Sequence, residues 1–298
     1  SSRVIVAECR RAGRMPGTVT RPSSTLCPSC GTLVGVKDEK CLNCGRRNPG
    51  MWGFAHSLRG IRDEGAFAQL VLWVCGALYL ATLAVDSQGI RTGGMLSFLS
   101  PSIRSLELFG ASGARPVFLD GRWWTFLSAS WLHGGVLHIL FNMLWIRDLA
   151  PATAHLYGVG RAVIIYCVSG AVGFVASTLG FFVPLPSFLR GGIVTIGASA
   201  AVFGLLGALL YYGRRTGSSH IGQQAKSFAI VLLIFGFILP GVDNWAHLGG
   251  LGGGYLTAKF LDPLKPERGD HLLISLGCLV ASALAILASV VDGLEILR

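Results

Sequence analysis

Long apolar stretches dominate the chain from residue 66 onward, and polar and charged residues gather between them. Seven of these stretches approach the roughly 20 residues with which an α-helix crosses the hydrocarbon core of a bilayer. The seven predicted spans are 66–85, 131–149, 161–182, 196–213, 227–240, 243–261 and 271–291. The pattern therefore predicts an all-α polytopic membrane protein, with a long loop at 86–130 between the first two spans.

Three further segments precede the first span. We expect a basic, disordered tail at 1–26, a cysteine-rich domain at 27–50 and a connector at 51–65. The apolar residues of the connector recur at helical spacing, which is typical of a helix lying in the membrane interface. A solvated linker is the alternative that this pattern leaves open.

Composition agrees with a membrane protein. Hydrophobic residues make up 52% of the chain and charged residues only 13%, about half of the ~25% that is usual in soluble domains. The 41 glycines favour close helix approach within a membrane, where small residues line helix interfaces. The lipid bilayer is thus the first expected partner.

The net charge of +10 is explained by membrane orientation, so no nucleic-acid partner is expected. With the N-terminus inside, the cytoplasmic segments hold 19 lysines and arginines and the outer segments hold 6. Cytoplasmic loops carry the excess of these residues, which places the N-terminus in the cytoplasm and the C-terminus outside. We expect a bacterial inner membrane, with an organelle membrane as the alternative.

The cysteine-rich domain contains two Cys-x2-Cys pairs separated by ten residues. Four thiolates at this spacing suit tetrahedral Zn²⁺, and a domain too small for a core would draw its folding free energy from the metal. Disulfides are disfavoured on the reducing side of the membrane, and iron is the other alternative. We therefore predict a structural zinc ribbon, with the ligands Cys27, Cys30, Cys41 and Cys44.

Two polar residues near the starts of predicted spans point to chemistry. Ser199 lies near the start of the fourth span and His247 near the start of the sixth, and both helices run from outside to inside in the predicted topology. The two side chains therefore lie at similar depth. An intramembrane ionisable residue marks a functional site by default, and a serine beside a histidine can act as nucleophile and base. The alternative is that the serine has only a packing role.

The second span carries His138 and Asn142, which lie four residues apart and thus on one helix face. Histidine and asparagine side chains donate hydrogen bonds, and donors aimed at a developing negative charge assist acyl transfer. The alternative is an interhelical hydrogen-bonded pair that only holds helices together.

These motifs, His-x3-Asn, Gly-x-Ser and Ala-His-x2-Gly-x3-Gly in this order, resemble the rhomboid intramembrane serine proteases over residues 66–261. The resemblance implies a six-helix bundle in which Ser199 is the nucleophile and His247 the general base, with no acidic third member. It implies that His138, Asn142 and the Ser199 N–H bind the oxyanion, and that Gly197 supplies tight backbone beside them. The span at 271–291 resembles the extra C-terminal helix of the six-plus-one layout.

The first loop departs from the family pattern. The family's Trp-Arg pair corresponds to Trp124-Thr125, so its arginine is replaced by threonine, which questions the anchoring contacts that the arginine usually provides. His133 matches a further histidine of the family and is expected to be structural. Phe203 stands where many members have tyrosine, and its ring is expected to pack on His247.

The resemblance implies hydrolysis of peptide bonds in or near transmembrane segments of membrane-anchored substrates, without a catalytic cofactor. A non-catalytic rhomboid-like binding or quality-control protein is the first alternative, although such proteins typically lack the serine or the histidine. A transporter or channel is the second, but it would be expected to show internal repeats or polar groups through the full depth. A cytoplasmic partner of the zinc ribbon is left open.

Overall fold

The computed structural model describes residues 24–50, 64–94, 97–186, 189–239 and 241–297. The chain divides into two compact units, residues 1–60 and 61–298. The predicted basic tail, apart from its last three residues, and most of the predicted connector lie outside the described residues.

The described part of the first unit is a small ribbon built on two short antiparallel strands, β1 (Ser24–Leu26) and β2 (Leu33–Gly35). Thr25 pairs with Val34, and both side chains are buried, whereas the neighbouring leucines point outward. Strand alternation thus supplies one inward face, against which two of the four cysteines are buried. The ribbon begins within the predicted tail, since β1 starts at residue 24.

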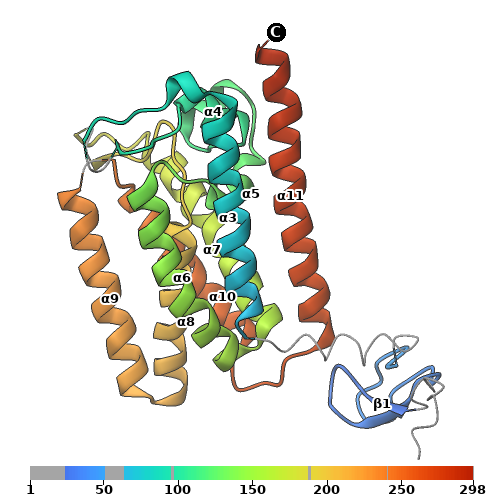
Figure 1. Ribbon diagram of the computed structural model, residues 1–298. Helices are drawn as coiled ribbons and strands as arrows, with labels where there is room; N and C mark the ends of the chain where they lie inside the picture. The colour runs from blue at the N-terminus through green and yellow to red at the C-terminus, as the bar shows by residue number, and fades with distance from the viewer. Residues whose placement is uncertain (1–23, 51–63, 95–96, 187–188, 240, 298) are drawn as a thin grey trace, which may run out of the picture. The chain divides into compact units, whose positions relative to one another are not determined.

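The second unit is a bundle of long helices (Figure 1). Seven helices of 18 or more residues occur in its described part, and they are α3 (Ala66–Val85), α6 (Val136–Tyr157), α7 (Val159–Gly180), α8 (Ser199–Thr216), α9 (Ser219–Ile238), α10 (Asn244–Leu261) and α11 (Gly269–Leu297). Each corresponds to one predicted span. A polytopic helical membrane bundle is therefore confirmed, and Figure 1 shows α9 and α11 at opposite edges of it.

The start of the second span is predicted wrongly. Residues 131–135 are not part of α6, which begins at Val136 after the two glycines Gly134 and Gly135. The preceding α5 (Thr125–Ser128) and a short 3-10 turn (Ala129–Trp131) meet α6 at an angle of 92°. A hydropathy pattern does not register this bend, because both arms are apolar.

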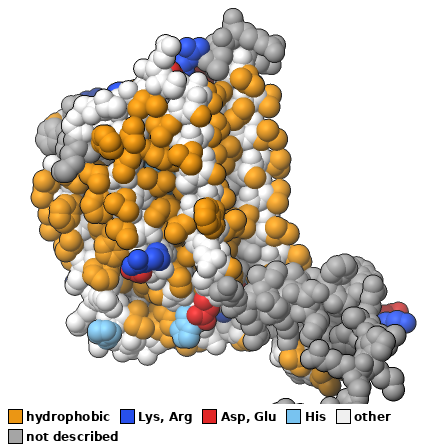
Figure 2. Space-filling view, in the orientation of Figure 1, with side chains coloured by type: hydrophobic (Ala, Val, Ile, Leu, Met, Phe, Trp, Pro, Cys, Tyr) orange, Lys and Arg blue, Asp and Glu red, His pale blue; other side chains and the backbone are white. Residues whose placement is uncertain are grey.

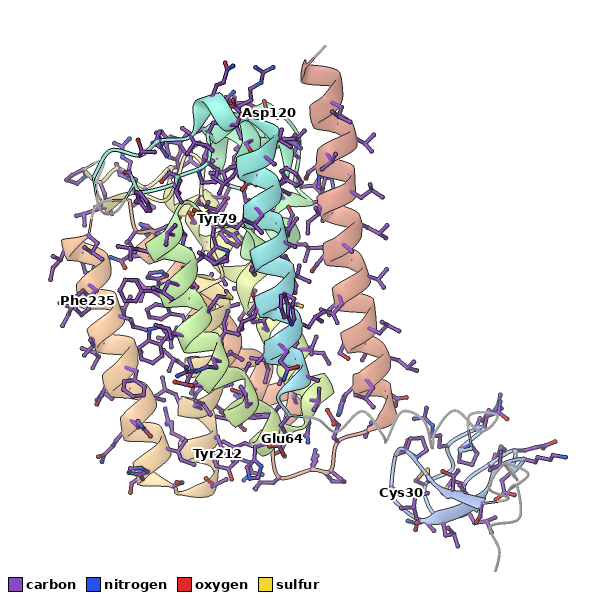
Figure 3. All side chains as sticks on the ribbon, viewed as in Figure 1. Cys30, Glu64, Tyr79, Asp120, Tyr212 and Phe235 are labelled. Atoms are coloured by element: carbon purple, nitrogen blue, oxygen red, sulfur yellow. The ribbon has the colours of Figure 1, made fainter. Side chains whose placement is uncertain are left out.

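Hydrophobic side chains cover much of the middle of the face shown in Figure 2. In Figure 3, Glu64 and Tyr212 lie at one end of this unit and Asp120 at the other, while Phe235 projects outward from α9. By length and apolar composition, α3, α7, α9 and α11 can each cross a membrane, and α5 with α6 can form one bent span.

Helices α8 and α10 do not meet this requirement for length and apolar composition. Most of α8 is buried against other helices rather than facing outward, so it can carry glycine and alanine where an outer helix needs large apolar side chains. The helix that bears the predicted serine is therefore largely interior to the bundle, whereas α10 buries the face that carries His247, Gly250 and Gly254.

The first loop is folded rather than extended. It contains α4 (Ile103–Leu108), a π-helical turn (Arg115–Leu119) and α5. The buried guanidinium of Arg122 donates to the backbone oxygens of Glu107 at 2.8 Å and Ser289 at 2.7 Å, and its Nε lies 3.0 Å from Asp292 Oδ2. The loop is thus anchored to α11 through Arg122, three residues before the threonine at which the family pattern is broken.

Candidate active site

The structure brings Ser199 and His247 into direct contact. Ser199 is the first residue of α8 and His247 the fourth residue of α10. Ser199 Oγ lies 3.0 Å from His247 Nε2, within hydrogen-bond distance. His247 is buried and Ser199 is half-buried. This is the arrangement that proton transfer from a serine hydroxyl to an imidazole requires.

Glycines at the contact between α8 and α10 make this distance attainable. A Cβ atom at Gly250 would lie 2.1 Å from the backbone oxygen of Ala200, and one at Gly254 would lie 2.0 Å from that of Gly204. Only hydrogen fits in these places. The two helices therefore pack backbone against backbone, as small residues allow in membrane bundles.

The imidazole of His247 is oriented by stacking. The ring of Phe203, one turn after Ser199 on the same helix, lies 4.3 Å from the imidazole centroid with an interplanar angle of 17°. His247 Nδ1 is buried and has no hydrogen-bond partner among the described residues. A carboxylate that orients the base, as in a serine–histidine–aspartate triad, is therefore absent from the described contacts of this ring.

His138 lies close to Gly197, two residues before the serine. The N–H of Gly134 donates to His138 Nδ1 at 3.2 Å, so a neutral imidazole carries its proton on Nε2. Gly197 has φ +126°, and a Cβ there would lie 2.6 Å from His138 Nε2 and 3.7 Å from Ser199 Oγ. A glycine at this position therefore allows both the left-handed backbone and the close approach of an N–H donor toward Ser199.

Asn142 is buried one turn below His138, and its Nδ2 donates to the backbone oxygen of His138 at 2.8 Å. The same nitrogen carries a second hydrogen. Both residues lie on α6, as the four-residue spacing predicts. Among the described hydrogen bonds, Asn142 forms none with Ser199 or His247.

The first turn of α8 supplies further donors. Its N–H groups have no intrahelical acceptor, and the helix dipole favours negative charge at this end. Ser199 itself occupies the first position, after a residue whose side chain forms no cap. An anion forming beside Ser199 would therefore meet the Ser199 N–H and the positive end of α8.

His133, the further histidine, is fully buried and stacks edge-on against His138, with ring centroids 5.2 Å apart. Neither of its ring nitrogens has a hydrogen-bond partner among the described residues. It packs behind His138 and has no contact with Ser199 in the described structure.

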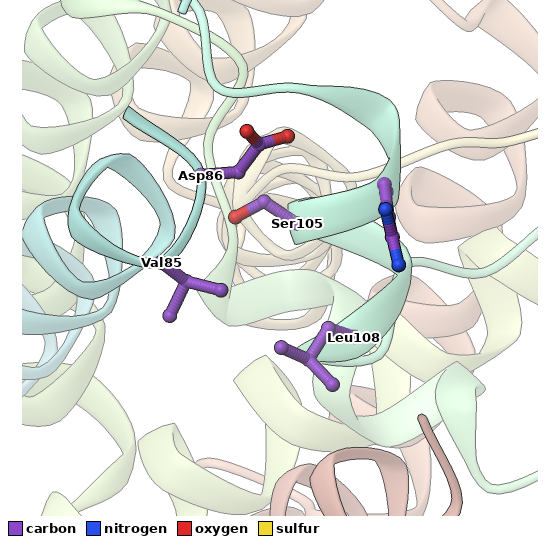
Figure 4. Close-up of a pocket in the computed structure, with 5 residues that line it drawn as sticks. Val85, Asp86, Ser105 and Leu108 are labelled. Carbon is purple, nitrogen blue, oxygen red and sulfur yellow. The ribbon is translucent and has the colours of Figure 1, made fainter. Parts of the chain in front are cut away.

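A separate pocket of about 250 Å³ lies between the end of α3 and the side of α4 (Figure 4). It is lined by Val85, Asp86, Arg104, Ser105 and Leu108. None of these residues belongs to the serine–histidine site, so the pocket does not bear on its chemistry.

The chain is similar to known proteins over the region that holds this site. The model of the Rhomboid domain matches residues 120–263, which include both Ser199 and His247. The putative rhomboid protease YdcA of Bacillus subtilis (strain 168) is 36% identical over 153 residues, which cover 50% of this chain and 72% of that protein. The chain belongs to the rhomboid family.

Longer rhomboids are also similar. Rhomboid protease GluP of Bacillus subtilis is 36% identical over 191 residues, or 63% of this chain and 36% of that protein. RHOMBOID-like protein 4 of Arabidopsis thaliana is 35% identical over 175 residues, or 57% of this chain and 42% of that protein. The chain thus spans less than half of the length of these two relatives.

The four ribbon cysteines form a second candidate site. Their sulfur atoms all lie within 4.8 Å of one another. Cys27 Sγ is 3.7 Å from Cys44 Sγ, and Cys30 Sγ is 3.5 Å from Cys41 Sγ. Zn–S bonds of about 2.3 Å in a tetrahedron place the sulfurs about 3.8 Å apart. Hydrogen bonding with Thr32 lowers the pKa of the Cys30 thiol to about 6.

Two residues beside the serine–histidine site are missing from the sequence-based prediction. Asp243 caps the helix that bears His247, and Ser177 on α7 donates a hydrogen bond to it. An aspartate directly before an apolar helix is a recognised N-cap signal, so Asp243 could have been found. Nothing in the sequence pairs it with Ser177, which lies 66 residues earlier.

Proposed function

We propose that this rhomboid is an intramembrane serine protease that hydrolyses peptide bonds in or near the transmembrane segments of membrane-anchored proteins. The 3.0 Å contact between Ser199 Oγ and His247 Nε2, inside a membrane bundle, carries this proposal. Family membership and the names of similar rhomboid proteases support it.

In the first step Ser199 Oγ attacks the carbonyl carbon of the scissile bond while His247 Nε2 accepts the hydroxyl proton. The tetrahedral intermediate collapses to an ester between Ser199 and the substrate acyl group, and the imidazolium returns the proton to the leaving amine. Water then attacks the ester with His247 again as base. The bond between the acyl carbon and Ser199 Oγ then breaks, which releases the carboxylic acid, and the imidazolium returns the proton to Oγ. Every proton transfer passes through His247 Nε2.

The oxyanion of both intermediates is bound by donors that are fixed before the reaction. These are the Ser199 N–H, the Nε2–H of His138 and the second Nδ2 hydrogen of Asn142. Such donors stabilise charge that develops in the transition state, and one of them contributes about 10²–10³ in turnover in soluble serine proteases. Because three donors stabilise the same oxyanion, each is expected to contribute less to turnover.

A non-catalytic binding role has less support. It requires neither a serine within hydrogen-bond distance of an imidazole nor glycine contacts that hold their two helices together, and this chain has both.

We also propose that the N-terminus lies in the cytoplasm and the active site in the outer half of the membrane, which the distribution of basic residues supports. Cysteines at two exposed positions, one in the first loop and one at the first residue of α9, test this orientation. Thr92→Cys should react with an impermeant thiol reagent in intact cells, and Ser219→Cys only after permeabilisation, relative to the wild-type background. Reaction of both from one face would refute the topology.

The ribbon cysteines fit a structural zinc ion. Cys27, Cys30, Cys41 and Cys44 would hold Zn²⁺ in a closed four-sulfur site, which stabilises the small domain and leaves no position for an activated water. The ribbon therefore has no step in the chemistry of Ser199. On the cytoplasmic side, its exposed face is available to a partner.

The decisive experiment incubates purified protein in detergent with a generic transmembrane substrate. Wild type should release a cleaved fragment, and Ser199→Ala and His247→Ala should each abolish cleavage while remaining folded. Their effects should not add, because the pair acts as a unit. Cleavage by a clean preparation of either variant would refute the assignment.

A further inference from the structure

The residue directly before α10 holds the first turn of that helix in two ways. Asp243 Oδ1 accepts a hydrogen bond from the N–H of Ala246 at 3.0 Å, and its backbone oxygen accepts one from the N–H of His247 at 3.2 Å. A carboxylate at this N-cap position also complements the helix dipole. The position of the His247 backbone therefore depends on where Asp243 lies.

The second carboxylate oxygen of Asp243 reaches a different part of the chain. Oδ2 accepts a hydrogen bond from the hydroxyl of Ser177, which is fully buried near the end of α7. The Ser177 oxygen in turn accepts from the N–H of Gly192 at 2.9 Å. Asp243, Ser177 and Gly192 thus form a three-membered bridge between α10, α7 and the loop that precedes α8.

Between Gly192 and Ser199, the loop before α8 is held by further hydrogen bonds. Thr195 exchanges two backbone hydrogen bonds with Ser112 of the first loop, at 2.7 and 3.0 Å, and the N–H of Gly197 donates to the oxygen of Ala129 at 2.9 Å. Ser199 follows two residues later. A shift of the bridge would therefore be passed to Ser199 from one side and to the histidine helix from the other.

We propose that Asp243 is a positioning residue that, through Ser177, sets the serine–histidine geometry from both sides. It is not a third member of a triad, because the described contacts of Asp243 include none with the imidazole, and His247 Nδ1 has no described partner. It acts through the main chain of α10 and through the loop before α8. This role rests on the protease function proposed above.

Two variants break the bridge from opposite ends. Ser177→Ala removes the bridging hydroxyl and leaves the carboxylate cap, and Asp243→Ser keeps a short N-cap acceptor that does not reach Ser177. Thr178→Val is the matched control: the Thr178 hydroxyl is buried on the same helix and has no hydrogen-bond partner among the described residues. The readouts are kcat and KM for a transmembrane substrate, the rate at which a fluorophosphonate labels Ser199, and Tm in detergent.

Each bridge variant should lower kcat and the labelling rate by about tenfold or more, because displacements of about 1 Å cost up to 10² in rate. KM should stay unchanged, and the double variant should be no slower than the single variants, because both remove one interaction. Thr178→Val should behave as wild type in all readouts.

Bridge variants that lower only Tm, with kcat and labelling intact, overturn the positioning role. Failure of both variants to fold overturns it as well, since the bridge would then serve folding. The proposed function is tested separately by the wild type. A folded wild-type protein that neither cleaves nor labels refutes that function and this inference with it, whereas an active wild type with unaffected bridge variants refutes only the inference.

Discussion

The contact between α8 and α10 makes a quantitative prediction about the substitution Gly250→Ala. The added Cβ would lie 2.1 Å from the backbone oxygen of Ala200, whereas real Cβ atoms essentially never approach closer than 3.0 Å. The clashing atom is backbone, so no side chain can move aside. The two helices must therefore separate by about 0.9 Å at this level.

This separation acts three residues from His247 and one residue from Ser199. An equal opening would lengthen the Oγ–Nε2 distance from 3.0 Å to about 3.9 Å, beyond the roughly 2.6–3.2 Å over which a base accepts a proton directly. We expect turnover to fall by about 10²-fold, which corresponds to about 2.7 kcal/mol in the activation free energy. Overpacking should also lower the free energy of unfolding by about 1–3 kcal/mol.

Gly252→Ala provides a matched control on the same helix. A Cβ at Gly252 meets no atom within 4 Å, and alanine is favoured over glycine within a helix by about 0.5–1 kcal/mol. Cleavage of a transmembrane substrate and Tm in detergent should therefore be unchanged or improved. Wild-type turnover in Gly250→Ala, with the control behaving as expected, would refute the claim that backbone contact between α8 and α10 sets the active-site distance.

Three further predictions concern the oxyanion donors, the first loop and the ribbon. Asn142→Ala should lower kcat by about 10²-fold or less with KM little changed, and a change confined to Tm would favour a purely structural role. Arg122→Ala should destabilise the protein by about 3 kcal/mol in detergent unfolding, because two hydrogen bonds from a charged donor are lost; an unchanged Tm would show that the anchor to α11 is dispensable. Purified protein should contain close to one zinc per chain by elemental analysis, and deletion of residues 1–50 should preserve cleavage of a generic substrate. A truncated protein that is inactive, beside a full-length protein whose activity depends on zinc, would contradict a purely structural ribbon.

Features set by local pattern could be predicted from the sequence. The seven spans follow from apolar stretches of the right length, and the positions of Ser199 and His247 near helix starts follow from where those stretches begin. The helix-facing glycines follow from their spacing. Each of these depends on residues within about 20 positions of one another, which is the range over which periodicity operates.

Features set by contacts between distant segments could not be predicted. Arg122 reaches Ser289, 167 residues away, and Asp243 reaches Ser177, 66 residues away. Both contacts join polar side chains of segments that are far apart in the sequence, where no periodic pattern exists to align the partners. The bend before α6 cannot be predicted for a different reason. Gly134 and Gly135 interrupt the helix within an apolar stretch, and the stretch is apolar on both sides of the bend.

The stacked pair of Phe203 and His247 bears on how the proposed dyad would work without a carboxylate beside the imidazole. A buried carboxylate beside the imidazole would have to be desolvated, which costs several kcal/mol per ion even in soluble proteins and is unfavourable in a membrane. An aromatic ring at 4.3 Å orients the base without introducing charge. The carboxylate of Asp243 instead accepts hydrogen bonds from the start of α10 and from Ser177. On the function proposed here, the acidic group fixes the backbone that carries the base, and the uncharged ring of Phe203 fixes the base itself.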